Sequence, residues 1–257
     1  MKCDKKELLL EGIKVCTGGV SEKGIEKKIN QDAFKIGICS DKELAYIIVA
    51  DGLGSCKYSD QGSQKVVEIL ENWILEKLPQ YSFLSDNVAN IMIKRLVEEW
   101  NKSYDIQEIS QFDTTVHLAI FYKKSALIGG IGDGMALLKC NEHICKDCID
   151  KADLFSNVTN SMCSINVSEL MSFEIIQEVD LDKEFIVILS TDGISDDLIP
   201  EKKLTLPGYF LEVLNQNGGD ALQCELEEWI GDWETESHSD DKTLCYLSIT
   251  GDKDNDK

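Results

Sequence analysis

Residues 44–54 have the sequence Leu-Ala-Tyr-Ile-Ile-Val-Ala-Asp-Gly-Leu-Gly. The run from Leu44 to Ala50 is almost continuously apolar, which is typical of a β-strand that is buried on both faces. It ends on Asp51, and the glycines that follow let the backbone bend or approach a ligand closely. This stretch therefore predicts a buried strand that delivers a carboxylate into a turn.

Two further strand-like runs end in the same way. Asp192-Gly193 and Asp133-Gly134 each follow an apolar run. One Asp-Gly pair after a strand is usually only a turn, because both residues are common in turns. Three such pairs in one chain favour a shared role for the three aspartates.

Two more acidic sites flank predicted strands: Asp32 precedes an early strand, and Asp240-Asp241 precedes the last one. A carboxylate buried alone is costly, so these groups should be exposed, hydrogen-bonded or bound to a cation. Hard oxygen ligands without a nearby His favour magnesium or manganese over zinc or copper. Two such ions about 3.5–4 Å apart can lower the pKa of a bridging water and clamp a phosphoryl group in line. If the strand ends converge, the pattern predicts phosphoester hydrolysis.

The hydrophobic pattern predicts a mixture of strands and helices. Strands are expected at 13–17, 33–39, 44–50, 115–122, 126–131, 135–140, 185–191 and 244–250. Apolar residues at helical spacing predict helices around 67–78, 88–100, 209–214 and 221–230. Residues 141–178 are polar and weakly patterned, and we expect a loop or flap there. Strands, a helix pair, more strands, further helices and a final strand indicate α+β layers rather than an alternating parallel sheet.

Length, charge and hydropathy narrow the class of protein. No linker, low-complexity tract or repeat divides the 257 residues, so a single domain spanning 1–257 is expected. The formal charge of -21 argues against nucleic acid and anionic membranes as partners, since their phosphates would be repelled. Ala45–Ala50 and Phe185–Leu189, the longest apolar runs, are too short to cross a bilayer, and Glu11 interrupts Leu8–Leu10 before a signal-peptide core can form. These features predict a soluble, cytoplasmic protein.

The ten cysteines fit free thiols in a reducing compartment, because several lie inside apolar strand-like runs. One cluster, formed by Cys140, His143, Cys145 and Cys148, has spacing that could suit zinc. A strong zinc pattern would show two separated pairs, whereas this cluster has one pair with two stragglers. Ordinary free thiols on a loop are the favoured interpretation.

The acidic elements resemble, in order, the motifs of the PPM or type-2C metal-dependent protein phosphatases, particularly their compact bacterial members. The matching stretches are Lys27–Ala33 for Arg-x-x-Asn-Glu-Asp-Ala, Val49–Gly54 for Val-Ala-Asp-Gly-Met-Gly, Thr114-Thr115 for the Gly-Ser/Thr-Thr strand start, Gly132–Gly134 for Gly-Asp-Ser, Ser190–Ile194 for Ser-Asp-Gly-Leu, and Asp240–Thr243 for Asp-Asp-Asn-Thr. Each motif is weak alone, but their joint order and spacing are specific. They extend over nearly the whole chain.

The resemblance implies a four-layer α-β-β-α sandwich of two antiparallel sheets flanked by helices, with the metal ions in a cleft at one end. The metal-binding residues that it implies are Asp32, Asp51, Gly52, Asp133, Asp192 and Asp241. Asp51 would bridge two ions, Mn²⁺ or Mg²⁺, with the Gly52 carbonyl on one of them. Asp192 and Asp241 would hold the other ion. Residues 141–178 would form the family's variable flap beside the substrate cleft.

Asp32 would act directly or through a water, and Asp133 matches a position that helps to hold a third, weaker ion. Lys27 stands where the family usually has a phosphate-binding Arg, so Asp51, Asp192 and Lys27 are the expected catalytic residues. Lysine supplies charge without a bidentate fork, which would alter the grip on phosphate. The competing interpretation places Lys27 in an exposed lysine pair with Lys28.

Three other positions depart from the family pattern. Gln31 replaces a glutamate, although its carbonyl could still bond a metal-bound water, and Lys242 replaces an asparagine with a cation that could compete with metal. Leu53 stands where some eukaryotic members have a His, which bacterial members often lack. The expected function is hydrolysis of phosphoserine and phosphothreonine in proteins by a water bridging two divalent cations. The partners would be a phosphorylated protein and a cognate Ser/Thr kinase. The alternative is an inactive pseudophosphatase that binds phosphoproteins as a regulatory module.

Overall fold

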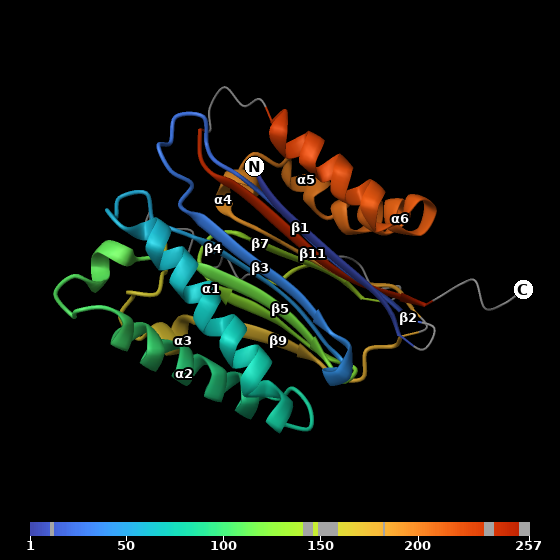
Figure 1. Cartoon of the computed structure of the whole chain (residues 1–257), viewed down its shortest axis with the longest axis horizontal. Helices are drawn as coiled ribbons and strands as arrows, with labels where there is room; N and C mark the ends of the chain where they lie inside the picture. The colour runs from blue at the N-terminus through green and yellow to red at the C-terminus, as the bar shows by residue number, and fades with distance from the viewer. Residues whose placement is uncertain (11–12, 141–145, 149–158, 182, 234–238, 252–257) are drawn as a thin grey trace, which may run out of the picture.

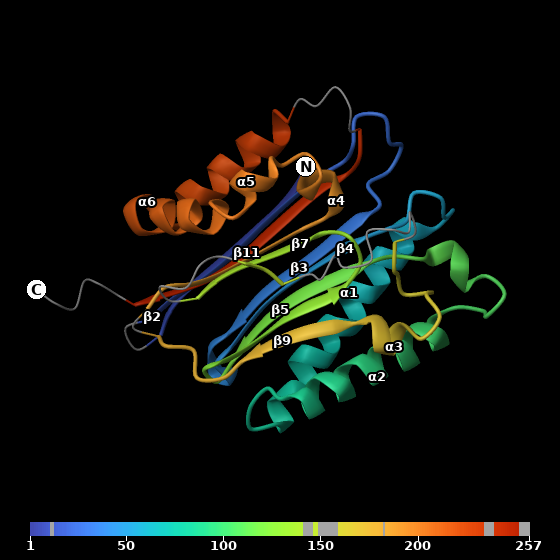
Figure 2. The same ribbon diagram turned by 180° about the vertical axis from the view of Figure 1, so that it is seen from behind.

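Two antiparallel β-sheets lie face to face in the middle of the molecule, and helices cover the outer side of each (Figures 1 and 2). This arrangement comes from a computed structural model, which describes every residue except 11–12, 141–145, 149–158, 182, 234–238 and 252–257. The predicted α+β, four-layer fold is confirmed. The sheets carry the site because the strand ends that hold its aspartates meet at one end of the sandwich.

The first sheet has six strands in the order β1-β2-β11-β10-β7-β8, and the second has five in the order β3-β4-β5-β6-β9. The strands of the first sheet are β1 (Lys2–Leu10), β2 (Ile13–Glu22), β7 (Met135–Cys140), β8 (Lys146–Asp147), β10 (Phe185–Ser190) and β11 (Lys242–Gly251). Those of the second are β3 (Asp32–Cys39), β4 (Leu44–Asp51), β5 (Val116–Tyr122), β6 (Ser125–Ile131) and β9 (Ser172–Ile176).

The helices fall into two outer layers. They are α1 (Ser59–Glu76), α2 (Asp86–Ser103), α3 (Val167–Leu170), α4 (Asp192–Ser195), α5 (Pro200–Lys203) and α6 (Leu206–Gly231). Three short 3-10 helices span Ser40–Lys42, Leu78–Gln80 and Ile109–Phe112. Helix α6 contains the two predicted helical stretches 209–214 and 221–230. They are separated at Gly218, whose φ of 86° is not helical.

Three apolar cores hold the layers together. Between the sheets lie side chains such as Phe34, Ile47 and Val187. Alternate residues of the same strands point outward, which is why β4 is apolar on both faces, as predicted. One outer core joins the five-stranded sheet to α1 and α2. The other joins the six-stranded sheet to α6.

Among the described residues, three edge strands were not expected from the sequence: β1, the two-residue β8 and β9. Strand β1 carries many charged residues because it lies at the edge of its sheet, where most of its side chains are exposed. Residues 172–176, within the segment expected to be a loop or flap, form β9, which pairs with β6. Phe173 and Ile175 of β9 pack against the core beneath α1 and α2, so two apolar residues suffice to place this edge strand.

Of the four residues whose spacing could suit zinc, Cys140 and Cys148 are half-buried free thiols, whereas His143 and Cys145 lie outside the described residues. Within the described part of the chain, no helix combines the length and the apolar character that a bilayer crossing requires.

Candidate active site

Strand pairing brings the predicted aspartates to one end of the sandwich. Asp32, the first residue of β3, is paired with Asp51, the last residue of β4. In the other sheet, Ser190 at the end of β10 pairs with Met135 on one side and with Leu244 on the other. Because the ladders are antiparallel, the segments that carry Asp192, Asp133 and Asp240-Asp241 also reach this end.

Close backbone packing fixes the turns after β4 and β10. A Cβ atom added to Gly52 would lie 2.6 Å from the carbonyl oxygen of Ser59, and one added to Gly193 would lie 2.0 Å from that of Asp241. Both distances are shorter than real contacts, so each position requires glycine. The Asp-Gly pairs seen in the sequence therefore reflect close approach of neighbouring segments as well as turn geometry.

Two threonines hold the side chain of Asp32. The Thr191 hydroxyl donates to Asp32 Oδ2 at 2.9 Å and the Thr243 hydroxyl at 2.7 Å. The two threonines are also hydrogen-bonded to each other through the backbone: the Thr191 N–H donates to the Thr243 carbonyl at 3.0 Å. These bonds link the two sheets at the site. Asp32 Oδ1 is buried and has no hydrogen-bond partner among the described residues.

Burial and mutual repulsion dominate the electrostatics. Burial raises the pKa of Asp32 to about 7, and the charges of Asp241 and Asp192 add to the effect, although the two threonine hydroxyls oppose it. Burial, followed by the charges of Asp32 and Asp192, raises the pKa of Asp51 well above its ordinary value. The pKa of Asp192 is raised by burial and by nearby Asp133 and Asp240, while a hydrogen bond with Asp51 opposes the shift. The site thus concentrates negative charge, with Lys27 as the cation paired to one of its carboxylates, Asp240.

The residues present fit divalent cations. The donors are carboxylate oxygens, which Mg²⁺ and Mn²⁺ prefer. Within the described residues, Oδ1 of Asp32 and of Asp192 is buried without a hydrogen-bond partner. Over the same residues, no group of three or more His, Cys, Asp or Glu side chains is arranged so that it could hold a metal ion as it stands. Mg²⁺ usually keeps several waters and takes only one or two carboxylates, so an open arrangement of this kind suits it.

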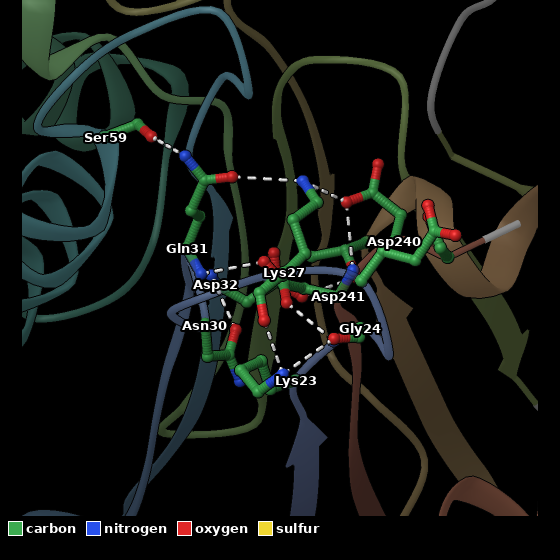
Figure 3. A network of polar contacts seen from close by, with 12 residues as sticks. Lys23, Gly24, Lys27, Asn30, Gln31, Asp32, Ser59, Asp240 and Asp241 are labelled. Atoms are coloured by element: carbon green, nitrogen blue, oxygen red, sulfur yellow. Dashed lines mark hydrogen bonds and ion pairs between the residues drawn. The ribbon is translucent and has the colours of Figure 1, made fainter.

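Asp240 and Asp241 have different environments (Figure 3). The two carboxylate oxygens of Asp241 accept backbone N–H groups: Oδ1 from Gly24 and Oδ2 from Gln31, both at 2.8 Å. Asp241 is 2% exposed and thereby fastens the β2–β3 loop to the start of β11. Asp240 instead lies 2.6 Å from the ammonium of Lys27, and its charge raises the pKa values of Asp51 and Asp192. Of the two, Asp240 is the residue whose carboxylate contacts Lys27 and acts electrostatically on Asp51 and Asp192.

Lys27 lies at the rim of this cluster (Figure 3). Its ammonium donates to Gln31 Oε1 at 3.0 Å and forms the ion pair with Asp240. Burial alone would lower the pKa of Lys27, but Asp240, together with Asp241 and Asp51, raises it, so the lysine is a secure cation. The amide of Gln31 is held at both ends, because Nε2 also donates to Ser59 Oγ at 2.5 Å. The competing interpretation paired Lys27 with Lys28 on the surface. Lys28 is exposed and takes no part in these contacts.

The remaining predicted residues lie around the cluster. Asp133, in the β6–β7 turn, accepts a hydrogen bond of 2.5 Å from the hydroxyl of Thr159. The ammonium of Lys242 donates to the backbone carbonyl of Asp240 at 3.2 Å and is buried. The N–H of Gly52 donates to the Gln31 carbonyl at 3.1 Å, which joins the turn after β4 to the β2–β3 loop.

The sequence analysis named the Asp240-Asp241 pair but gave the ligand role to Asp241, and it did not single out Asp113. Asp113 is 8% exposed and accepts from the Ser161 hydroxyl at 2.7 Å and from the Cys163 N–H at 3.0 Å. It therefore anchors the described end of the segment expected to be the flap. The position of Asp113 directly before the Thr114-Thr115 motif was the sequence feature that could have indicated this role.

The described residues thus form a sandwich of two antiparallel sheets with a buried carboxylate cluster at one end. The sequence matches the protein phosphatase 2C family over residues 19–231, and the chain belongs to that family. A comparison with curated proteins finds no match.

Solved structures of bacterial phosphatases share the fold. RsbX, solved in complex with magnesium, is 15% identical with a TM-score of 0.60, covering 96% of this chain and 100% of its own. A bacterial serine phosphatase is 17% identical with a TM-score of 0.65, covering 92% and 98%. The serine/threonine phosphatase Stp1 from Staphylococcus aureus is 16% identical with a TM-score of 0.63, covering 95% and 96%. At these identities the likeness concerns the fold alone.

Proposed function

We propose that this chain hydrolyses phosphoserine and phosphothreonine in proteins with the help of two divalent cations, Mn²⁺ or Mg²⁺. The observation that carries the proposal is the buried cluster of Asp32, Asp51 and Asp192, whose pKa values are all raised. Such a cluster is costly unless it is protonated or neutralised by cations. Cations bound there would supply the positive charge that phosphoryl transfer needs and would make water a better nucleophile at neutral pH.

The chain's own residues take distinct roles in this proposal. Asp51 at the end of β4, the Gly52 carbonyl, Asp192 and Asp240 would hold the ions, which would supply positive charge for the phosphoryl group and activate water. Asp32, fixed by Thr191 and Thr243, keeps one oxygen free to orient a water.

Asp240 is the proposed metal ligand in place of Asp241, the residue expected from the sequence. The reason is that both oxygens of Asp241 already accept backbone N–H groups, whereas the contacts of the Asp240 carboxylate among the described residues are the Lys27 ammonium and one backbone N–H, that of Asp241 at 2.9 Å. Asp133 remains the residue proposed for a third, weaker ion.

Lys27 binds the substrate phosphate. Its ammonium is charged and partly exposed, and a phosphate dianion can replace Asp240 as its partner once a cation holds that carboxylate. A phosphorylated protein is the substrate, and a Ser/Thr kinase supplies the phosphate. We also propose that the protein acts in the cytoplasm as one domain, 1–257, with 141–178 bordering the cleft.

The same ion pair favours a second candidate, a pseudophosphatase that binds phosphoproteins without cleaving them. In that case Lys27 would stay on Asp240 and Gln31, and it would keep cations away from the cluster. The two candidates differ in whether metal binds and phosphate is released.

The deciding experiment is hydrolysis of a phosphothreonine peptide by the purified chain, with Mn²⁺ or with EDTA, beside Asp51→Asn and Asp192→Asn. Manganese-dependent release that falls at least about 1,000-fold in both variants would support the hydrolase. Release that persists in both variants would contradict the metal mechanism. No release from the native chain under any condition would favour the pseudophosphatase.

A further inference from the structure

The C-terminal end of α6 carries an open hollow of about 480 Å³ that is lined by Glu228, Trp229, Asp232 and Trp233. Glu228 and Trp229 belong to the last turn of α6, whereas Asp232 is its C-terminal cap and Trp233 follows directly after it, so the helix end and the first residues beyond it bring two indoles and two carboxylates together. The hollow therefore presents aromatic faces and negative charges side by side.

The two indoles are held in place and remain accessible. Trp229 is 36% exposed and stacks on Tyr209, with ring centroids 5.5 Å apart. The indole N–H of Trp233 donates to Asp197 Oδ2 at 3.0 Å. By contrast, Trp73 and Trp100 are buried at 8% and 1% exposure and belong to the core under α1 and α2.

The carboxylates of the hollow are uncompensated. Glu228 and Asp232 are both exposed, and neither has an ion-pair partner among the described residues. No lysine or arginine lines the hollow within that part of the chain. An indole face attracts a cation through its quadrupole, and nearby carboxylates add Coulomb attraction. A guanidinium or ammonium group on an apolar stem complements both features.

The hollow lies at the active-site end of the sandwich. Helix α6 ends at the same end as the β2–β3 loop that carries Lys27 (Figure 1). Trp233 is bonded to Asp197, which lies just beyond α4, the helix that begins with Asp192. A polypeptide whose phosphorylated residue occupies the site can therefore extend toward the hollow.

We infer that this hollow binds an arginine or lysine side chain of the phosphoprotein substrate, and so selects substrates with a basic residue near the phosphorylated one. The inference rests on the proposed function for the identity of the ligand. The site itself rests on the indoles and carboxylates. It also gives the strongly acidic chain a specific place at which to hold a basic partner.

The test uses phosphothreonine peptides with one arginine at successive positions on either side of the phosphorylated residue, each matched to a twin with norleucine. With the native chain and Mn²⁺, we expect one position at which arginine lowers KM at least about 5-fold without changing kcat. The double variant Glu228→Gln/Asp232→Asn should abolish that difference and leave hydrolysis of a small aryl phosphate unchanged.

The matched control is Glu43→Gln/Glu178→Gln. It makes the same change in net charge with exposed residues at the opposite end of the five-stranded sheet, and the arginine preference should persist. If both double variants lose the arginine preference equally, the preference depends only on the net charge of the protein, and the inference is overturned. The absence of an arginine preference at every position would do the same.

A binding measurement separates this inference from the proposed function. Indole N–H signals of Trp229 and Trp233 are followed by NMR while an unphosphorylated arginine peptide is added. Chemical-shift changes that occur in the native chain and disappear in Glu228→Gln/Asp232→Asn support the site, whether or not a phosphate ester is hydrolysed. Absence of hydrolysis would contradict only the proposed function. Unchanged signals would overturn the site.

Discussion

Asp32 and Asp51 face each other across the first pair of the β3–β4 ladder. Like charges directly opposite on neighbouring strands are destabilising, and here burial raises the cost further. The pairing is thus unfavourable for an ionised, metal-free protein. It becomes favourable once a cation lies between the carboxylates and their neighbour Asp192.

Metal binding should therefore stabilise the fold. At a manganese concentration one hundred times Kd, ligand linkage predicts a gain of about 2.7 kcal/mol. That gain corresponds to a rise in Tm of roughly 5–10 °C for a domain of this size. Calorimetry with and without Mn²⁺ checks it, and Asp51→Asn should lose most of the rise. An equal rise in that variant would place the metal elsewhere.

The two consecutive aspartates before β11 should respond differently to substitution. Asp240→Asn should weaken manganese binding at least about 10-fold with little change in the metal-free Tm. Asp241→Asn leaves one backbone N–H of Gly24 or Gln31 facing an amide NH₂ group, which costs about 1–3 kcal/mol of stability. Titration calorimetry and chemical unfolding of both variants measure the two effects. The reverse result would restore Asp241 as the metal ligand.

Lys27 should act on substrate affinity. Lys27→Arg offers phosphate a bidentate fork and should lower KM for a phosphopeptide about 3- to 10-fold, whereas Lys27→Met should raise it at least about 10-fold. Lys28→Met removes the same charge from the exposed neighbour and serves as the control. If both methionine variants behave alike, Lys27 contributes only to the general surface charge.

The metal-free protein should lose stability as pH rises from about 4 to about 7. The folded-state pKa of Asp32 is about 7, above the ordinary value near 3.9, so in this window the native state binds more protons than the unfolded state. The stabilisation is complete below about pH 4 and is lost through pH 7, with the raised pKa values of Asp51 and Asp192 acting in the same direction.

Denaturant midpoints in EDTA across this range measure the loss, which should be on the order of a few kcal/mol. Saturating Mn²⁺ should flatten or reverse the slope, because it favours the ionised carboxylates. A midpoint in EDTA that rises toward pH 7 would contradict the raised pKa values.

Most of the fold was predictable because its central strands and long helices carry strong local patterns. Strand β4 is apolar throughout because both of its faces are buried, and α1 and α2 show apolar residues at helical spacing. Strands β1 and β9 escaped prediction because edge strands bury little surface, so their sequences need not alternate clearly.

The sequence by itself determined which carboxylates the strands deliver into turns, since strand apolarity and the following glycines are local properties. Only the tertiary structure decided how those carboxylates are used. Asp240 and Asp241 are chemically identical neighbours, yet successive side chains of an extended segment point to opposite sides. The carboxylate of Asp240 therefore contacts Lys27 and lies near Asp51 and Asp192, whereas that of Asp241 binds the backbone of the β2–β3 loop. That choice depends on segments distant in sequence, which no local pattern records.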